Sequence, residues 1–320
     1  MKKSIQSVFL PFVLLTVLLN GCTPASTPIS PTLILPTSTF SPIPPTFTIE
    51  PSATATLIPS PTPLPGSVVL PVNTLGNSIP WLPLDKTAIP TVNYVGFNTV
   101  KSPFNNALVR QAFAYSIDRA VILGLANKYK VINPTPATTL TPPQTLGRDL
   151  YGVVGTNYDP QKAKDLLTQA GYTNPSSFPT VIFIVNASGD TMPGARFNMA
   201  NAMAQMWQTH LGIKVEIQAI PSFNDYLNRL KTNPPDLFWV GWAADYNDPA
   251  NFIGELFNSN GDYHGEYNYG HFSNSEFDDL ISHAANSNDP IIRQELYIQA
   301  ERLLCETEAA IIPLYFSITH

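Results

Sequence analysis

The stretch from residue 180 to residue 242 alternates between two hydrophobic periods, and this alternation limits the fold more than any other feature. "TVIFIVN" (180–186) and "DLFWVGW" (236–242) are short apolar runs typical of buried strands, and "IKVEIQAI" (213–220) alternates like a half-buried strand. Between them, "GARFNMANAMAQMWQTHLG" and "FNDYLNRL" are patterned like helices. The order strand, helix, strand, helix, strand predicts an α/β fold with a mixed, largely parallel sheet and right-handed crossovers.

Further helices flank this stretch. "NALVRQAFAYSIDRAVILGL" (106–125) has apolar residues at a spacing of four up to Val121, which predicts one continuous helix. "YDPQKAKDLLTQAGY" predicts a short helix capped by Asp159, with proline at its first position and Gly171 at its end. A last helix from about Pro290 to Glu306 leads into a strand that starts in "AAIIPLYF".

The amino-terminal residues have the layout of an export signal. Two lysines precede an apolar run from Val8 to Leu19, which is shorter than the roughly 20 residues that a membrane-spanning helix needs. "LNGC", ending at Cys22, resembles a bacterial lipobox. We therefore expect residues 1–21 to be a lipoprotein signal peptide and Cys22 to be lipidated; an ordinary signal peptide ending near Ala25 is the alternative.

The composition of the rest of the chain indicates a stalk, a short connecting segment and a folded domain. Residues 22–66 are mostly proline, threonine and serine, with one acid and no lysine or arginine, so we expect a disordered stalk that cannot bury a core. Residues 67–91 form a short connecting segment, and the folded domain spans residues 92–320. With Cys22 lipidated, Cys305 is the one thiol left, so no internal disulfide can form. The formal net charge of -6, without a basic cluster, argues against a nucleic-acid partner.

Catalytic and metal-binding motifs are missing. The sequence contains no Gly-x-Ser-x-Gly elbow, no His-Glu-x-x-His, no phosphate loop and no Gly-x-Gly-x-x-Gly. Its five histidines are scattered without metal-ligand spacing, and "DYNDPANFIGE" lacks the glycine and glutamate that a calcium loop requires. The sequence therefore predicts a protein that is not an enzyme and has neither a cofactor nor a bound metal.

Two predicted loops lie where open α/β sheets bind ligands, beyond the carboxyl ends of strands. They span residues 186–191 and 243–248. In the second loop, Asp248 followed by proline is the signature of a helix N-cap. Asp245 lies three residues earlier, near Trp242, and its carboxylate could accept hydrogen bonds from a ligand ammonium group. Spacing alone leaves ligand contact and a simple loop ion pair as open alternatives for Asp245.

Five segments carry a family resemblance. They are, in order, "YVGFNTVKSPFNNALVRQAFAYSIDRAVI", "YDPQKAKDLLTQAGY", "LGIKVEIQAIPSFNDYLNRL", "DLFWVGWAADYNDPANFI" and "AERLLCETEAAIIPLYF". Together they resemble solute-binding protein family 5, the extracytoplasmic receptors of oligopeptide, dipeptide and nickel ABC importers. The resemblance runs from about Val92 to the end of the sequence.

The resemblance implies a periplasmic-binding-protein-like fold of type II, cluster C, in which two lobes close on a ligand and deliver it to an ABC permease. In peptide-binding members, the aspartate of the "GW-x-x-D-Y" motif holds the free α-amine of the ligand, which is Asp245 here. Trp242 would line the cleft, and Tyr246 and Asn247 complete the candidate ligand-binding residues. The expected protein is exported and anchored by lipid to the outer face of the cytoplasmic membrane.

One departure from the family pattern concerns length. Family members have a long region before the "GFNT" motif and a further stretch after "IPLYF", which together build most of the first lobe. We therefore expect this sequence, truncated at both ends relative to the family, to form mainly the second lobe. A fragment of a longer receptor, a degenerate copy, and one part of an assembly with a separate first lobe remain open.

Other functions compete with the peptide receptor. An oligosaccharide receptor of the same family could stack sugars on Trp239, Trp242, Tyr246 and Tyr267. A surface hydrolase could pair Asp245 with Asp236 or Glu255 as two carboxylates. A surface module without a transport role is the third alternative.

Overall fold

The structure is a computed structural model that describes residues 88–319, apart from residues 144, 146–153, 191 and 260–265. The predictions for the signal segment 1–21, for Cys22, for the stalk 22–66 and for most of the connecting segment 67–91 lie outside the described residues. Within the described ranges, no helix is both long enough and apolar enough to cross a membrane.

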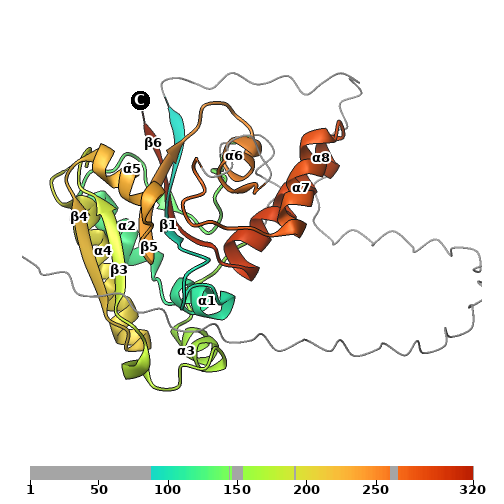
Figure 1. The fold of residues 1–320 in the computed structure, drawn as a ribbon. Coiled ribbons are helices and arrows are strands. Elements are labelled where there is room, and N and C mark those ends of the chain that lie inside the picture. The colour runs from blue at the N-terminus through green and yellow to red at the C-terminus, as the bar shows by residue number, and fades with distance from the viewer. Residues whose placement is uncertain (1–87, 144, 146–153, 191, 260–265, 320) are drawn as a thin grey trace, which may run out of the picture. The chain divides into compact units, whose positions relative to one another are not determined.

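A six-stranded sheet organises the described part of the chain, with the order β2-β6-β1-β5-β3-β4. Strands β1 and β6 come from opposite ends of the described chain and lie side by side in the middle of the fold (Figure 1). The strands are β1 (Ile89–Phe97), β2 (Thr135–Pro136), β3 (Val181–Asn186), β4 (Val215–Ile220), β5 (Leu237–Ala243) and β6 (Ile311–Thr319).

The expected mixed α/β sheet is confirmed, but its parallel part is smaller than predicted. β3 pairs in parallel with β4 and with β5, as the strand and helix alternation requires. β1 is antiparallel to both β5 and β6, and β2 is antiparallel to β6. The periodicity of residues 180–242 reports only on that segment, whereas the antiparallel half is assembled from strands far apart in the sequence.

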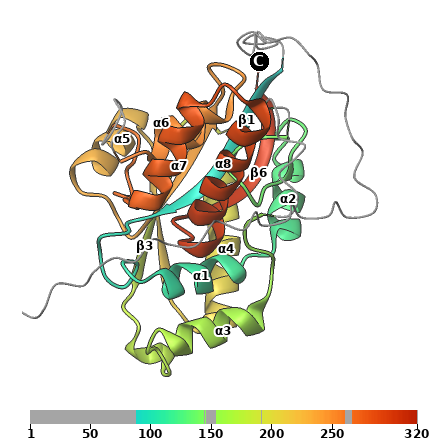
Figure 2. The ribbon, with the colours of Figure 1, turned by 90° about the vertical axis from the view of Figure 1, so that its right-hand side faces the viewer.

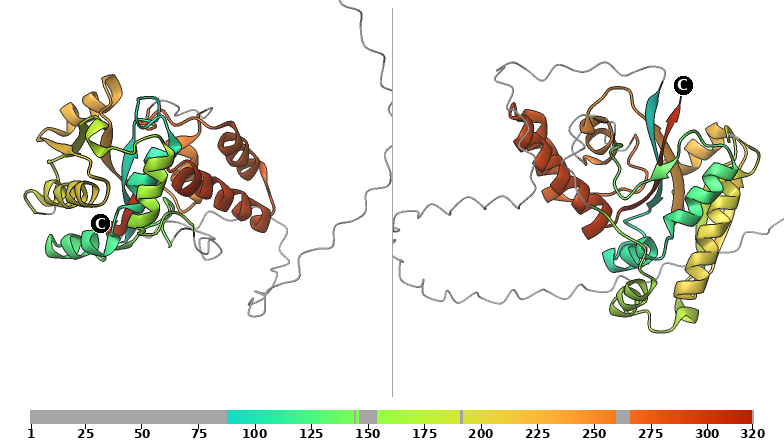
Figure 3. Two further views of the ribbon diagram at one scale, coloured as in Figure 1. Left: turned by 90° about the horizontal axis from the view of Figure 1, so that it is seen from below. Right: turned by 180° about the vertical axis from the view of Figure 1, so that it is seen from behind.

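Helices cover both faces of the sheet. α2 and α4 lie on one face and α6, α7 and α8 on the other (Figures 1 and 3). The helices are α1 (Ala107–Tyr115), α2 (Arg119–Lys128), α3 (Pro160–Gln169), α4 (Ala195–Leu211), α5 (Phe223–Thr232), α6 (Ile253–Phe257), α7 (Ser275–Asn286) and α8 (Pro290–Arg302). Short turns of 3-10 or π helix are η2 (Pro175–Ser177), η3 (Pro249–Asn251) and η4 (Leu303–Thr307).

The segment 106–125 is two helices, so the prediction of one continuous helix is wrong. Helix α1 ends at Tyr115, and the Asp118 side chain caps α2 by accepting a hydrogen bond from the Ala120 N–H at 2.9 Å. An aspartate inside an apolar period can act as a cap instead of a surface residue, and the period alone does not distinguish the two roles. The break turns Val121 outward, where 45% of it is exposed.

Predicted helix ends are confirmed elsewhere. The Asp159 carboxylate caps α3 by accepting from the Lys162 N–H at 2.9 Å. α3 then lies below α1 (Figure 2), and the Lys162 ammonium donates to the Tyr115 hydroxyl at 2.7 Å. Gly212 ends α4 with a φ of +70°, a left-handed conformation that glycine adopts without steric cost.

Candidate ligand-binding site

Strand β5 has an open edge at its carboxyl end. β3 pairs with β5 only as far as Phe238, whereas β1 pairs with its other edge as far as Ala243. Successive residues of a strand point their N–H and C=O groups to opposite edges. The Ala244 N–H donates to the Pro90 carbonyl on the β1 side at 2.9 Å. Since the direction alternates along the strand, the backbone N–H and C=O groups of Gly241 and Ala243 point to the other, open edge. In the described part of the chain they have no ladder partner, so an added strand can pair there.

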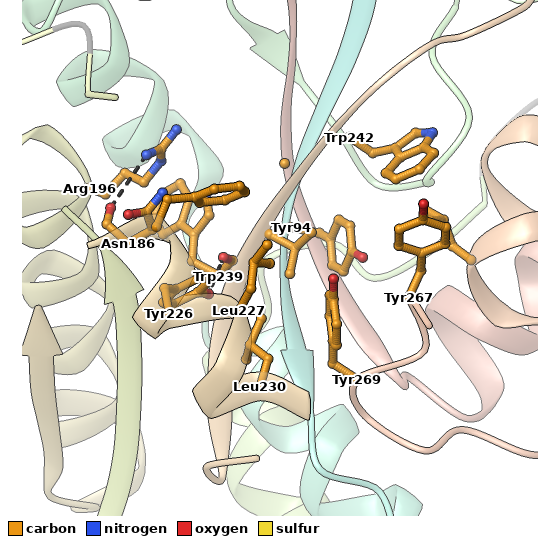
Figure 4. A pocket seen from close by; sticks show the side chains of 14 residues that line it. Tyr94, Asn186, Arg196, Tyr226, Leu227, Leu230, Trp239, Trp242, Tyr267 and Tyr269 are labelled. Atoms are coloured by element: carbon orange, nitrogen blue, oxygen red, sulfur yellow. Dashed lines mark hydrogen bonds between the residues drawn. The ribbon is translucent and has the colours of Figure 1, made fainter. Parts of the chain in front are cut away.

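A cavity of about 230 Å³ lies on one face of this edge, where β3 and β5 part. Helix α5 contributes Phe223 and Leu227 to its wall, and its Tyr226 hydroxyl donates to the Trp239 carbonyl. Trp242 closes the cavity on the side opposite α5 (Figure 4). The walls are therefore mainly aromatic and aliphatic.

A second cavity, of about 340 Å³, lies on the other face. Its lining includes Asn93, Asp190 and Tyr315. Asn93 pairs in register with Gly241, and side chains of neighbouring strand residues point to opposite faces, so this cavity and the first one flank the open edge from its two faces. Gly241 and Arg196 line both cavities.

Arg196 is the one cationic residue among the described residues that line the two cavities. One nitrogen of its guanidinium group lies 3.1 Å from the Asp190 carboxylate and donates to the Ser188 carbonyl at 3.1 Å. Burial raises the pKa of Asp190, and the positive charge of Arg196 opposes this rise. The loop between β3 and α4 therefore holds Arg196 at the carboxyl end of β3.

The candidate residues predicted from the sequence lie close together in the chain but differ in their surroundings. Trp242 lines the first cavity, and its ring packs edge-on against Tyr267 at 5.0 Å. Asp245 is exposed, just beyond the end of β5, and does not line either cavity. Tyr246 and Asn247 are half-buried and also lie outside both linings. Asp248 caps η3, as its sequence signature predicts.

The residue that connects this cluster is Asn251, which no pattern in the sequence singles out. Its side chain is fully buried, and its Oδ1 accepts from the Asp245 N–H at 2.9 Å and from the Trp242 indole at 3.4 Å. Its Nδ2 donates to Glu255 at 3.1 Å and lies 3.5 Å from the Asp245 carboxylate. Glu255 in turn accepts from the Tyr246 hydroxyl. Asn251 therefore fixes the turn that presents Asp245, and only the folded turn reveals this role.

Two of the alternative sites lose support from the geometry. Trp239 is 2% exposed and donates to Asn93 at 3.1 Å, so its face is not available as a sugar platform. Asp236 precedes β5 and Asp245 follows it, which puts the two carboxylates more than about 20 Å apart at the rise of a strand. Asp236 is instead in an ion pair with Lys101 at 2.6 Å. Asn251 does bring Glu255 near Asp245, but Glu255 is held by Tyr246.

Comparison with known proteins decides the family. Residues 71–264 match the family model of bacterial extracellular solute-binding proteins, family 5, middle part. The chain belongs to this family. The family groups solute-binding proteins rather than enzymes, which supports a binding role for this member, and its extracellular character supports export. No cluster of three or more metal-ligating side chains occurs among the described residues.

Individual relatives cover a similar part of the chain. The periplasmic oligopeptide-binding protein OppA of Salmonella typhimurium is 30% identical over 229 residues, which are 70% of this chain and 39% of OppA. Heme-binding protein A of Haemophilus influenzae is 32% identical over 234 residues, 71% of this chain and 39% of that protein. The structure of DppA from Helicobacter pylori in complex with the peptide STSA is 25% identical, with a TM-score of 0.60, and covers 72% of this chain and 42% of that one. The chain thus spans about two fifths of the length of these relatives.

Proposed function

We propose that this protein is a substrate-binding component of an ABC importer that takes up short peptides. The observation that carries the proposal is the open edge of β5, where Gly241 and Ala243 offer backbone donors and acceptors between two cavities. An extended peptide pairs with such an edge through its main chain and places alternate side chains toward the two faces. The names of OppA and of the DppA complex, which refer to peptides, support the same ligand class.

Asp245 is the proposed partner of the ligand's α-amine. Asp245 is exposed two residues beyond the end of β5, and Asn251 holds its backbone N–H. A carboxylate that accepts from an ammonium group makes a charge-assisted hydrogen bond, which is stronger than a neutral one. In this arrangement Trp242 forms a wall beside the peptide, and Tyr246 and Asn247 contact it from the same turn as Asp245.

The proposal extends to the residues that precede the folded part. Residues 1–21 act as a lipoprotein signal peptide, lipid on Cys22 anchors the protein to the outer face of the cytoplasmic membrane, and residues 22–66 form the stalk. Residues 67–91 connect the stalk to the domain 92–320, although residues 89–91 already belong to β1. The domain corresponds mainly to the second lobe of the family. A peptide ligand and a membrane permease are the partners in this proposal.

A thermal melt of the full-length protein tests the ligand class. With a pool of short peptides the melting temperature is expected to rise, because a ligand that binds only the folded state stabilises it by mass action. With the same pool after N-acetylation we expect a much smaller rise, because the amine has lost its charge and the peptides bind more weakly. A rise with oligosaccharides and none with peptides would contradict the proposal and support the sugar receptor.

The lipid anchor has a separate test. Cells grown with labelled palmitate are expected to label the wild-type protein and to leave Cys22→Ala unlabelled, and the variant is expected to appear in the soluble fraction. Cys305→Ala is the matched control, since Cys305 is buried and should not accept lipid. Equal labelling of wild type and Cys22→Ala would rule out this anchor.

A further inference from the structure

The first cavity has an inner end built almost entirely from aromatic rings. Tyr94 from β1, Trp242 from β5, and Tyr267 and Tyr269 from the loop before α7 surround it (Figure 4). The Trp242 and Tyr267 rings pack edge-on with their centroids 5.0 Å apart. Rings at such angles offer both faces and edges to a further ring, which is the arrangement that aromatic side chains prefer.

Two hydroxyl groups in this end are available to a ligand. Tyr94 is 1% exposed and Tyr269 is 8% exposed, and in the described part of the chain neither hydroxyl makes a hydrogen bond. Burial, followed by the nearby Tyr269 and Tyr226, raises the pKa of Tyr94 well above its ordinary value. Burial, Tyr267 and Glu266 raise the pKa of Tyr269 to about 12. Both groups are therefore neutral at physiological pH, and each can donate or accept a hydrogen bond.

The charge of the lining residues and the volume of the cavity limit which chemical group of a ligand fits there. None of the residues that line this cavity is acidic, and its one charged lining residue is Arg196. A cationic side chain would therefore lose its hydration without gaining a carboxylate. The volume of about 230 Å³ exceeds the roughly 150 Å³ of an engineered apolar cavity that binds benzene. The cavity thus has room for one aromatic side chain and not for a whole peptide.

We infer that this cavity is a specificity pocket for one aromatic side chain of the ligand, and that it favours tyrosine over phenylalanine. The ring fills the space between Trp242, Tyr267 and Leu227, and its hydroxyl satisfies those of Tyr94 and Tyr269. Phenylalanine fills the same space but leaves these buried hydroxyls without a partner, which carries a free-energy cost. The inference rests on the proposed function, because it needs a peptide on the open edge of β5 to place the side chain.

Isothermal titration of the full-length protein with a set of tripeptides tests the inference. The set is tri-alanine and its derivatives with a single tyrosine, phenylalanine, lysine or glutamate at each position. At one position we expect tyrosine to bind on the order of tenfold more tightly than alanine, with phenylalanine between them and the charged residues no tighter than alanine. Equal affinity for all side chains, or a preference for lysine, would contradict the proposed specificity pocket but not the proposed peptide-binding function. Failure of every tripeptide to bind would overturn the proposed function and the pocket together.

Two variants locate the effect in the cavity. Leu227→Trp places a ring in the cavity and is expected to lower the ratio of tyrosine to alanine affinity severalfold. Ile292→Trp introduces the same side chain at a position on α8 that is 52% exposed, and should leave the ratio unchanged. Tyr94→Phe removes one hydroxyl without changing the fold and is expected to reduce only the preference for tyrosine over phenylalanine. The assignment of the pocket would be contradicted if Leu227→Trp left the ratio of tyrosine to alanine affinity unchanged and Tyr94→Phe left the ratio of tyrosine to phenylalanine affinity unchanged.

Discussion

Replacing Asp245 by asparagine is expected to weaken the binding of peptides with a free amine by roughly tenfold to a hundredfold, since hydrogen bonds to charged groups contribute about 1.5–3 kcal/mol. The substitution keeps the size of the side chain and removes the charge that attracts the ammonium group. The Asp245 N–H still donates to Asn251, so the turn is retained. Titration with free and N-acetylated forms of one tripeptide measures the effect.

The acetylated peptide makes this a double-mutant cycle. If Asp245 contacts the amine, wild type and Asp245→Asn bind the acetylated form with similar, weak affinity, and the two changes are strongly non-additive. Asp279→Asn is the matched control, because Asp279 is an exposed carboxylate on α7 that lines neither cavity beside β5. Additive losses, or an equal loss in the control, would show that the effect is one of net charge rather than of contact with the amine.

The sequence predicted those parts of the fold whose signals are local. The strand and helix alternation of residues 180–242 predicted β3, α4, β4, α5 and β5, because each of these elements carries its own hydrophobic period. The antiparallel partners of β5 could not be read in this way. β1 reaches β5 and β6 across most of the described chain, and pairing at that separation depends on packing rather than on a local pattern.

The residues of the candidate site also differ in whether a local sequence signal identifies them. Asp245 was a candidate because it follows a buried strand, and strand ends are visible in a sequence, whereas the role of Trp242 as a wall of the cleft came from the family resemblance. Asn251, by contrast, is one asparagine among many until the turn is folded, and its buried amide then contacts Trp242, Asp245 and Glu255. Two tyrosines of the specificity pocket, Tyr94 and Tyr269, were missed for a related reason. Tyr94 belongs to β1 and Tyr269 to the loop before α7, and only the folded chain brings them to the same cavity.

Arg293→Met is expected to destabilise the protein by about 3 kcal/mol, since breaking a buried ion pair leaves one charge without a partner. Both terminal guanidinium nitrogens of Arg293 donate to the Asp248 carboxylate, at 2.7 and 2.8 Å, and the side chains are 15% and 8% exposed. Burial alone would lower the pKa of Arg293, but its hydrogen bonds to Asp248 raise it above the ordinary value. Methionine preserves much of the alkyl stem, so most of the loss comes from the unpaired Asp248. The midpoint of urea denaturation measures the change.

The same helix provides the control. Arg302 lies on α8 in an ion pair with Glu306 at 3.9 Å, with side chains 53% and 39% exposed. Arg302→Met is expected to change stability by less than about 1 kcal/mol, because solvent screens such a pair. A change of similar size in both variants would mean that the alkyl stems, and not the buried charge, account for the loss.

A second variant separates the unpaired charge from the loss of the pair itself. Adding Asp248→Asn to Arg293→Met removes the buried charge, and asparagine can still cap η3 through its side-chain oxygen, where Asp248 now accepts from the Ala250 N–H at 2.9 Å. The double variant should therefore be more stable than Arg293→Met alone. That order of stabilities requires the carboxylate at residue 248 to be costly when it stands alone. The result would show that Arg293, 45 residues further along the chain, offsets the cost of burying an aspartate directly behind the turn that presents Asp245.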